Sequence, residues 1–316
     1  MLIRVELAGR LSLLAGERWM DTARLGRNDR LAFAYLMHER SRQVSRSELA
    51  ELVWEANLPA TWKTALRGMI SRIRGALATA GLPAGTLHTG SGWYEMSLPE
   101  QTTVDVESAE SSLASAVDLL AQGHTGLARA AAEKALAVAR QPFLAGVHAG
   151  WVEQRQERLD DLRLQALEVI TDAALHSSDW ATARRCAEQA ITMAPLRESA
   201  YRRLALMHAG CGDRGEALRI LAQCRRTLAE ELGADVSPET EAMSVRLLRG
   251  TPWPALFPAT SDAARRPDRP RLARPGQPTG VPIESWVDTS NTFVGRVTEL
   301  AQLRAAWQRA VEGSPE

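Results

Sequence analysis

The 316-residue chain carries 38 basic and 38 acidic side chains, so its formal net charge is zero. At roughly 100 to 200 residues per domain, this length predicts two folded domains and a tail. There is no run of about eighteen apolar residues and no secretory signal segment after Met1. Both observations argue against a membrane protein and predict a soluble, cytoplasmic one.

The cysteine and histidine contents argue against an enzyme. Three cysteines without a C-x-x-C spacing predict reduced, mostly buried thiols and not a disulfide framework or a metal site: Cys186, Cys211 and Cys224. The histidines are scattered, and the motifs of zinc proteases, serine hydrolases and dinucleotide-binding enzymes are missing. We therefore expect no catalytic residues, no cofactor and no metal ion.

The first forty residues predict a small sheet and then a helix. Residues 2–7 and 11–14 have strand character and are separated by a glycine. A helix is expected from about Asn28 to Glu39, with Asn28 as its N-cap. The side chains expected to pack beneath the next two helices are Leu31, Ala34, Tyr35, Leu36 and His38.

A second helix is predicted to begin at Ser45. Ser45 and Glu48 have the spacing of a capping box and precede an apolar run that reaches Trp54. Asn57 and Pro59 are expected to separate this helix from the next one.

The segment from Ala56 to Tyr94 contains no Asp or Glu. A helix from about Trp62 to Leu77 would sort this segment into an apolar face and a basic face. The apolar stripe comprises Leu66, Ile70, Ile73 and Leu77, bordered by Trp62 and Met69, and the opposite side carries Lys63, Arg67, Ser71 and Arg74, flanked by Arg72. Such a helix can dock on a core and present its cations to phosphates and base edges. A solvated surface helix is the alternative interpretation.

Residues 87–98 predict two short strands around a glycine turn, which is the pattern of a β-hairpin. Helix, turn, basic helix and hairpin together are typical of a winged helix-turn-helix. The sequence therefore predicts an α+β N-terminal domain with a small antiparallel sheet, three helices and a C-terminal wing.

From about Asp105 to Arg249 the composition is rich in Ala and Leu with helical spacing, which predicts an all-α domain. Asp179 and Asp213 occupy equivalent places in two similar segments 34 residues apart, the period of tetratricopeptide repeats. Stacked helix pairs of this kind leave a concave surface for another protein. Alternatively, the repeats only support the winged helix.

Beyond Gly250 the composition changes, because eight of the fifteen prolines lie between Pro252 and Pro282. This pattern predicts a Pro/Arg-rich linker at 251–290. Residues 292–303 resemble the opening of AAA-like and STAND NTPase domains, so 291–316 is expected to begin such a domain. The chain ends before any Walker A lysine. We expect either an expressed fragment or a naturally shortened member of regulators that continue into an NTPase.

Five segments in a fixed order resemble the SARP family of antibiotic-pathway activators. They lie at 44–49, 71–77, 90–94, 104–107 and 228–233. The resemblance implies an OmpR-type winged-helix DNA-binding domain at 1–100 and a bacterial transcriptional activator domain at 101–250. Gly68 and Met69 depart from the family pattern, since relatives often carry a polar, base-reading residue at the position of Met69.

Several functional expectations follow from this resemblance. The residues expected to bind DNA are Lys63, Thr64, Arg67, Met69, Ser71, Arg72, Arg74 and Trp93. The family implies two protomers, a dimer, on direct repeats of double-stranded promoter DNA, contact with RNA polymerase and its sigma factor, and activation of a secondary-metabolite gene cluster. A second class stays open: a tetratricopeptide adaptor of a signalling NTPase, with a winged helix that binds protein.

Overall fold

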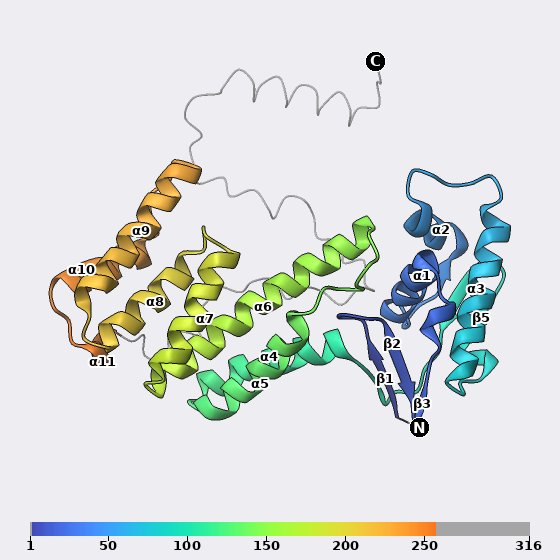
Figure 1. Ribbon diagram of the computed structural model, residues 1–316, viewed down its shortest axis with the longest axis horizontal. Coiled ribbons are helices and arrows are strands. Elements are labelled where there is room, and N and C mark those ends of the chain that lie inside the picture. Colours follow the sequence, from blue (N-terminus) through green and yellow to red (C-terminus); the bar gives the residue numbers. More distant parts are fainter. Residues whose placement is uncertain (1, 257–316) are drawn as a thin grey trace, which may run out of the picture. The chain divides into compact units, whose positions relative to one another are not determined.

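The computed structural model describes residues 2–256 (Figure 1). Small sheets and three helices make up the N-terminal part, and helices make up the remainder. The expected NTPase opening at 291–316 and most of the expected linker lie outside the described residues. Among residues 2–256, no helix combines the length and the hydropathy that a bilayer crossing requires.

The first sheet has four strands in the order β3-β2-β1-β7. Their bounds are β1 (Ile3–Glu6), β2 (Ser12–Ala15), β3 (Arg18–Trp19) and β7 (Thr102–Val104). Strands β1, β2 and β3 pair antiparallel, as their alternating pattern predicts, with Ile3, Val5 and Leu13 on the buried face. Strand β7 was not expected: it pairs parallel with β1, with Ile3 opposite Thr102.

Three helices and a hairpin follow in the predicted order. They are α1 (Arg27–His38), α2 (Arg46–Trp54), α3 (Trp62–Thr79), β5 (Leu87–Thr89) and β6 (Trp93–Met96), with short 3₁₀ turns at Thr22–Arg24 and Ala84–Thr86. Strand β4 (Val44–Ser45) pairs with β6, which gives a second sheet in the order β4-β6-β5.

The helix caps were predicted correctly in one case and wrongly in the other. Helix α2 begins after Ser45, whose Oγ accepts the N–H of Glu48 at 3.1 Å while the Glu48 carboxylate accepts the N–H of Ser45 at 3.3 Å. The N-cap of α1 is Gly26 and not Asn28. The reason is the Asp29 carboxylate, which accepts the N–H of Gly26 at 2.9 Å and so starts the helix earlier.

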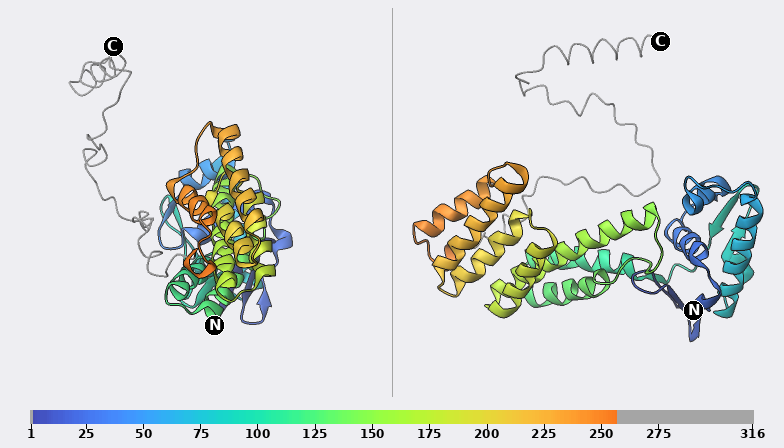
Figure 2. Two further views of the ribbon diagram at one scale, coloured as in Figure 1. Left: turned by 90° about the vertical axis from the view of Figure 1, so that its left-hand side faces the viewer. Right: turned by 45° about the horizontal axis from the view of Figure 1, so that its top comes forward.

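Eight helices follow within the described residues, and successive helices from α4 to α9 pack against each other (Figures 1 and 2). Their bounds are α4 (Asp105–Ala121), α5 (Thr125–Ala139), α6 (Gly150–His176), α7 (Trp180–Met193), α8 (Glu198–Gly210), α9 (Arg214–Leu232), α10 (Pro238–Leu248) and α11 (Trp253–Leu256). Asp179 and Asp213 cap α7 and α9 in the same way, each accepting a backbone N–H three residues later. Their 34-residue spacing in the sequence therefore marks equivalent helix starts.

Helix α11 lies beyond Gly250, where an extended linker was expected to begin. Leu256 is only 3% exposed and packs in the core around α8. The ring of Trp253 meets that of Trp180 edge-on, with centroids 5.4 Å apart. Apolar burial thus extends the folded part of the chain to Leu256.

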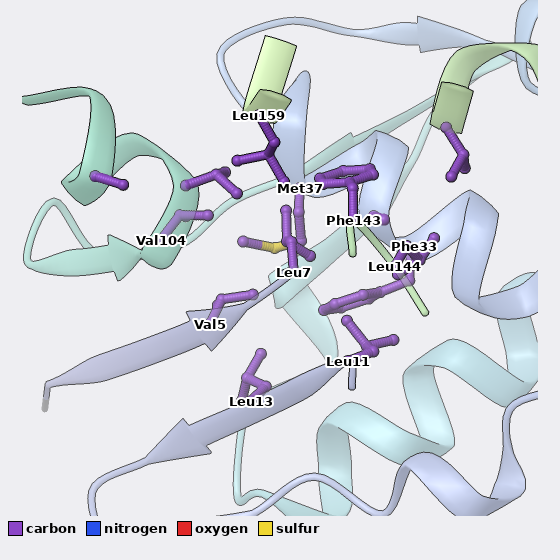
Figure 3. Packing of buried hydrophobic residues seen from close by; sticks show 14 of the residues in the cluster. Val5, Leu7, Leu11, Leu13, Phe33, Met37, Val104, Phe143, Leu144 and Leu159 are labelled. Carbon is purple, nitrogen blue, oxygen red and sulfur yellow. The ribbon is translucent and has the colours of Figure 1, made fainter. Parts of the chain in front are cut away.

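The N-terminal sheet and the helices share one core. Leu7 and Leu11 from the β1–β2 connection and Phe33 and Met37 from α1 lie among side chains of the α5–α6 connection and α6 (Figure 3). The backbone is joined as well, because the N–H of Leu144 donates to the carbonyl of Leu7 at 2.7 Å.

Asp105 is the central polar group of this junction. Its carboxylate accepts the N–H groups of Leu7 and Ala8, both at 2.9 Å. Burial raises the pKa of Asp105, while these hydrogen bonds act in the opposite direction. The first residue of α4 is thereby fixed to the end of β1.

Candidate nucleic-acid interface

Helix α3 buries the face that the sequence predicts. Leu66, Ile70, Ile73 and Leu77 all belong to the core. Met69 is buried with them at 2% exposure, so its expected place at a DNA-reading surface is wrong. The reason is geometric: Met69 is three residues from Leu66 and four from Ile73, and residues at these spacings share one helix face.

The opposite face of α3 exposes four of the expected residues: Lys63, Thr64, Arg67 and Ser71. The ammonium group of Lys63 lies 5.6 Å from the centroid of the Trp62 ring, over the indole. Within residues 2–256, Arg67 makes no ion pair or side-chain hydrogen bond. These two cations therefore remain available to an anionic partner.

Arg72 is engaged by a neighbouring helix. Its guanidinium donates to both carboxylate oxygens of Asp29 on α1, at 2.7 and 2.9 Å. The hydrogen bond to Asp29 raises the pKa of Arg72. Because the Asp29 side chain is 4% exposed and that of Arg72 is 52% exposed, the pair neutralises a buried carboxylate from the surface side. Arg72 was expected to contact phosphates, and here it ties α3 to α1.

Arg74 is engaged by the hairpin. Its Nε and Nη2 both donate to the carbonyl of Leu87, at 3.1 and 2.7 Å, and Nη2 also donates to the hydroxyl of Thr89. This guanidinium was also expected at the DNA surface, but its donors are directed toward β5.

Trp93 follows the hairpin turn and is half-buried. Its indole lies directly over Gly90, since a Cβ at that position would overlap with the ring. Gly92 adopts φ +95°, a conformation that favours glycine. The turn therefore requires glycine at two positions for different reasons. At Gly90 the Trp93 ring leaves no space for a Cβ, and at Gly92 the backbone has a positive φ.

Sequence reasoning missed Arg46, which touches the same turn from α2. Its Nη2 donates to the carbonyl of Gly90 at 3.1 Å, and its guanidinium lies 5.6 Å from the centroid of the Tyr94 ring. The one signal in the sequence was the position of Arg46 immediately after the predicted cap residue Ser45. The structure adds that the strand of Ser45, β4, pairs with β6.

The start of α2 is fixed by a network around Glu48. The hydroxyl of Tyr35 donates to Glu48 at 2.6 Å, and Arg42 donates to the same carboxylate. The hydrogen bond from Arg42 lowers the pKa of Glu48, whereas burial and the Glu48 hydrogen bond raise the pKa of Tyr35 to about 12. This network positions α2 and β4 and presents no nucleophile or metal ligand set. The described residues contain no cluster of three side chains that could hold a metal ion.

Comparison with known proteins identifies a known domain family in the helical part of the chain. Residues 104–248 match the family described as the bacterial transcriptional activator domain. Regulatory protein AfsR of Streptomyces coelicolor is 30% identical over 242 residues, which cover 76% of this chain and 24% of that protein. AfsR of Streptomyces griseus is 30% identical over 289 residues, covering 89% of this chain and 27% of that protein.

Regulatory protein DnrI of Streptomyces peucetius is 24% identical over 247 residues, 76% of this chain and 90% of DnrI. Among solved structures, Mycobacterium tuberculosis EmbR in complex with a low-affinity phosphopeptide has the same fold, with a TM-score of 0.74, 22% identity, and coverage of 83% of this chain and 68% of that one. Residues 104–248 are thus a helical bacterial transcriptional activator domain, and small sheets and three helices precede it in the chain. The chain is similar to AfsR and DnrI, the SARP-type regulators that its sequence resembles, and it spans about a quarter of the length of the AfsR proteins.

Proposed function

We propose that this chain is a sequence-specific DNA-binding transcriptional activator. Residues 1–100 would form an OmpR-type winged helix-turn-helix, and residues 101–250 a tetratricopeptide-like activator domain. The observation that carries the proposal is the exposed face of α3, where Lys63 and Arg67 stand in a segment without any acidic residue. A surface of this kind favours a polyanion.

In this proposal α3 enters the major groove. Lys63, Thr64 and Ser71 contact phosphates or base edges, and Arg67 donates two hydrogen bonds to one guanine. The turn before Trp93 reaches the adjacent minor groove or backbone. Arg72 and Arg74 support α3 and the hairpin from within the protein.

The family supports a wider role. Two protomers would bind direct repeats near a promoter, and the helical domain would contact RNA polymerase and its sigma factor. The regulated genes would belong to a secondary-metabolite cluster.

Footprinting and titration on the DNA upstream of the chain's own gene test the proposal. The wild type should protect a repeated sequence, and Arg67→Ala should relax the preference at one base pair per half-site, losing about 1 to 3 kcal/mol of discrimination. Arg226→Ala, an exposed arginine on α9, is the matched control and should bind like the wild type. Equal binding by Lys63→Ala, Arg67→Ala and the wild type would reject α3 as the DNA reader and favour a protein-binding adaptor.

A further inference from the structure

Two arginines from different helices hold the β5–β6 hairpin. Arg74 on α3 donates to the carbonyl of Leu87 and to the hydroxyl of Thr89, both in β5. Arg46 on α2 donates through its side chain to the carbonyl of Gly90 and through its backbone N–H to that of Gly92, at 2.9 Å. The hairpin is therefore contacted from both helices, at β5 and at the turn.

The hairpin needs such contacts because its own pairing is short. Three residue pairs join β5 to β6, and two join β6 to β4. Isolated two-stranded hairpins are marginally stable in water, and glycine adds conformational freedom at the turn. Hydrogen bonds from charged donors are among the stronger ones in proteins.

Both guanidiniums direct hydrogen bonds at the hairpin. Nε and Nη2 of Arg74 point at one carbonyl oxygen, so this fork is turned toward β5. The guanidinium of Arg46 lies over the Tyr94 ring, and its Nε is buried there without a hydrogen-bond partner among the described residues. Neither geometry resembles that of Arg67, which faces solvent on the same side of α3 as Lys63.

We propose that Arg74 and Arg46 are positioning residues for DNA recognition, which fix the hairpin turn and Trp93 at a set distance from the exposed face of α3. The inference rests on the proposed function. Arg74 acts through the hairpin and makes no phosphate contact, although its position in the sequence matches a recognition-helix arginine. We call these contacts of Arg74 and Arg46 with the hairpin the clamp. Because the clamp orders the hairpin before DNA binds, it raises the affinity for DNA, but it releases no counterions from the phosphates.

Two measurements on the full chain test this role: amide hydrogen exchange across residues 87–96, and DNA affinity over a range of salt concentrations. Arg74→Ala should speed exchange in the hairpin and lower affinity by about tenfold, with an unchanged salt slope, because the phosphate contacts are retained. Arg46→Ala should behave in the same way. Lys63→Ala is the matched control, and as a phosphate contact it should reduce the salt slope by ~1 while hairpin exchange stays as in the wild type.

A salt slope reduced by ~1 in Arg74→Ala, with unchanged hairpin exchange, would make Arg74 a phosphate contact and overturn the inference. Unchanged exchange and unchanged affinity would overturn it as well. If Arg74→Ala fails to fold, Thr89→Val removes one acceptor of the clamp and should give the same pattern at smaller size. Failure of the proposed function is a separate result, since the wild type itself would then not bind DNA.

Discussion

At the scale of single residues, side chains that look alike in the sequence have different surroundings in the structure. Arg67, Arg72 and Arg74 lie on one helix within eight positions. Arg67 is exposed and makes no ion pair within residues 2–256, Arg72 neutralises Asp29, and Arg74 donates to Leu87. Periodicity placed Arg67 and Arg74 on the basic face and Arg72 beside it, and it could not reveal the partners of Arg72 and Arg74, because tertiary packing sets them.

Arg72→Ala is expected to lower stability. The change leaves the buried carboxylate of Asp29 without its guanidinium partner, and the free energy of unfolding should fall by about 2 kcal/mol, less than for a fully buried pair because Arg72 is half exposed. Urea denaturation measures the change. Arg67→Ala on the same helix should stay within about 0.5 kcal/mol of the wild type. Equal stability of both variants would show that the Asp29 pair contributes nothing.

Glu48 should give stability a dependence on acidic pH. Its pKa in the folded chain is lowered from 4.5, chiefly by the hydrogen bond from Arg42. A lowered pKa contributes stability that is present above about pH 4.5 and is lost as the pH falls through the folded value. Glu48→Gln should therefore cost about 1 to 2 kcal/mol at pH 7, and the difference from the wild type should shrink below pH 4.5.

Thermal unfolding measures this pH dependence. The wild type and Glu48→Gln are compared between pH 3 and pH 7, in steps of about one pH unit. Glu51→Gln is the control, because Glu51 is exposed on the same helix and makes no ion pair within residues 2–256. A difference between the wild type and Glu48→Gln that is constant over the whole range would contradict the linkage.

At the scale of elements, local patterns predicted much of the N-terminal part and long-range pairing escaped them. The capping box at Ser45, the start of α3 at Trp62 and the hairpin around Gly90 all follow from a few neighbouring residues. Strand β7 could not be predicted in this way, because its partner β1 lies about a hundred residues earlier and short strands carry little signal of their own. Met69 was misplaced for a different reason: its spacing from Leu66 and Ile73 places it on the buried face, whereas the family pattern suggested a DNA-reading position.

Gly68→Ala should stabilise α3. Glycine inside a helix costs about 0.5 to 1 kcal/mol relative to alanine. An added Cβ would lie 3.5 Å from Nη1 of Arg72, an ordinary van der Waals contact, so the methyl group has room. The free energy of unfolding should rise by about 0.5 to 1 kcal/mol in urea denaturation.

The matched control for this change is Gly92→Ala, which should be destabilised because Gly92 has a positive φ. A loss of stability in Gly68→Ala would show that the backbone at this position, or its contact with Arg72, requires glycine.

At the scale of the whole described chain, the N-terminal sheet and the helices pack around one shared core. Side chains of β1, α1 and α6 belong to the same buried cluster, and Trp151 at the start of α6 contacts three rings: Tyr35, His38 and Phe143. Further contacts join the end of α2 to α6, since the Glu55 carboxylate accepts the N–H of Gly150 at 2.9 Å. These contacts fix α1 and α2, the helices that pack with α3, to α6.

Trp151→Ala should uncouple the two parts. Removal of the half-buried indole should cost about 2 to 3 kcal/mol, somewhat less than for a fully buried tryptophan, and weaken the attachment of α1 to α6. Cleavage by a glutamyl endopeptidase at Glu107, in the first turn of α4, should be slow in the wild type and faster in the variant, since opening of the junction exposes this backbone. Trp19→Ala is the matched control, because Trp19 is 56% exposed on β3 and lies outside the junction. Equal cleavage rates in both tryptophan variants would show that Trp151 does not hold the two parts together.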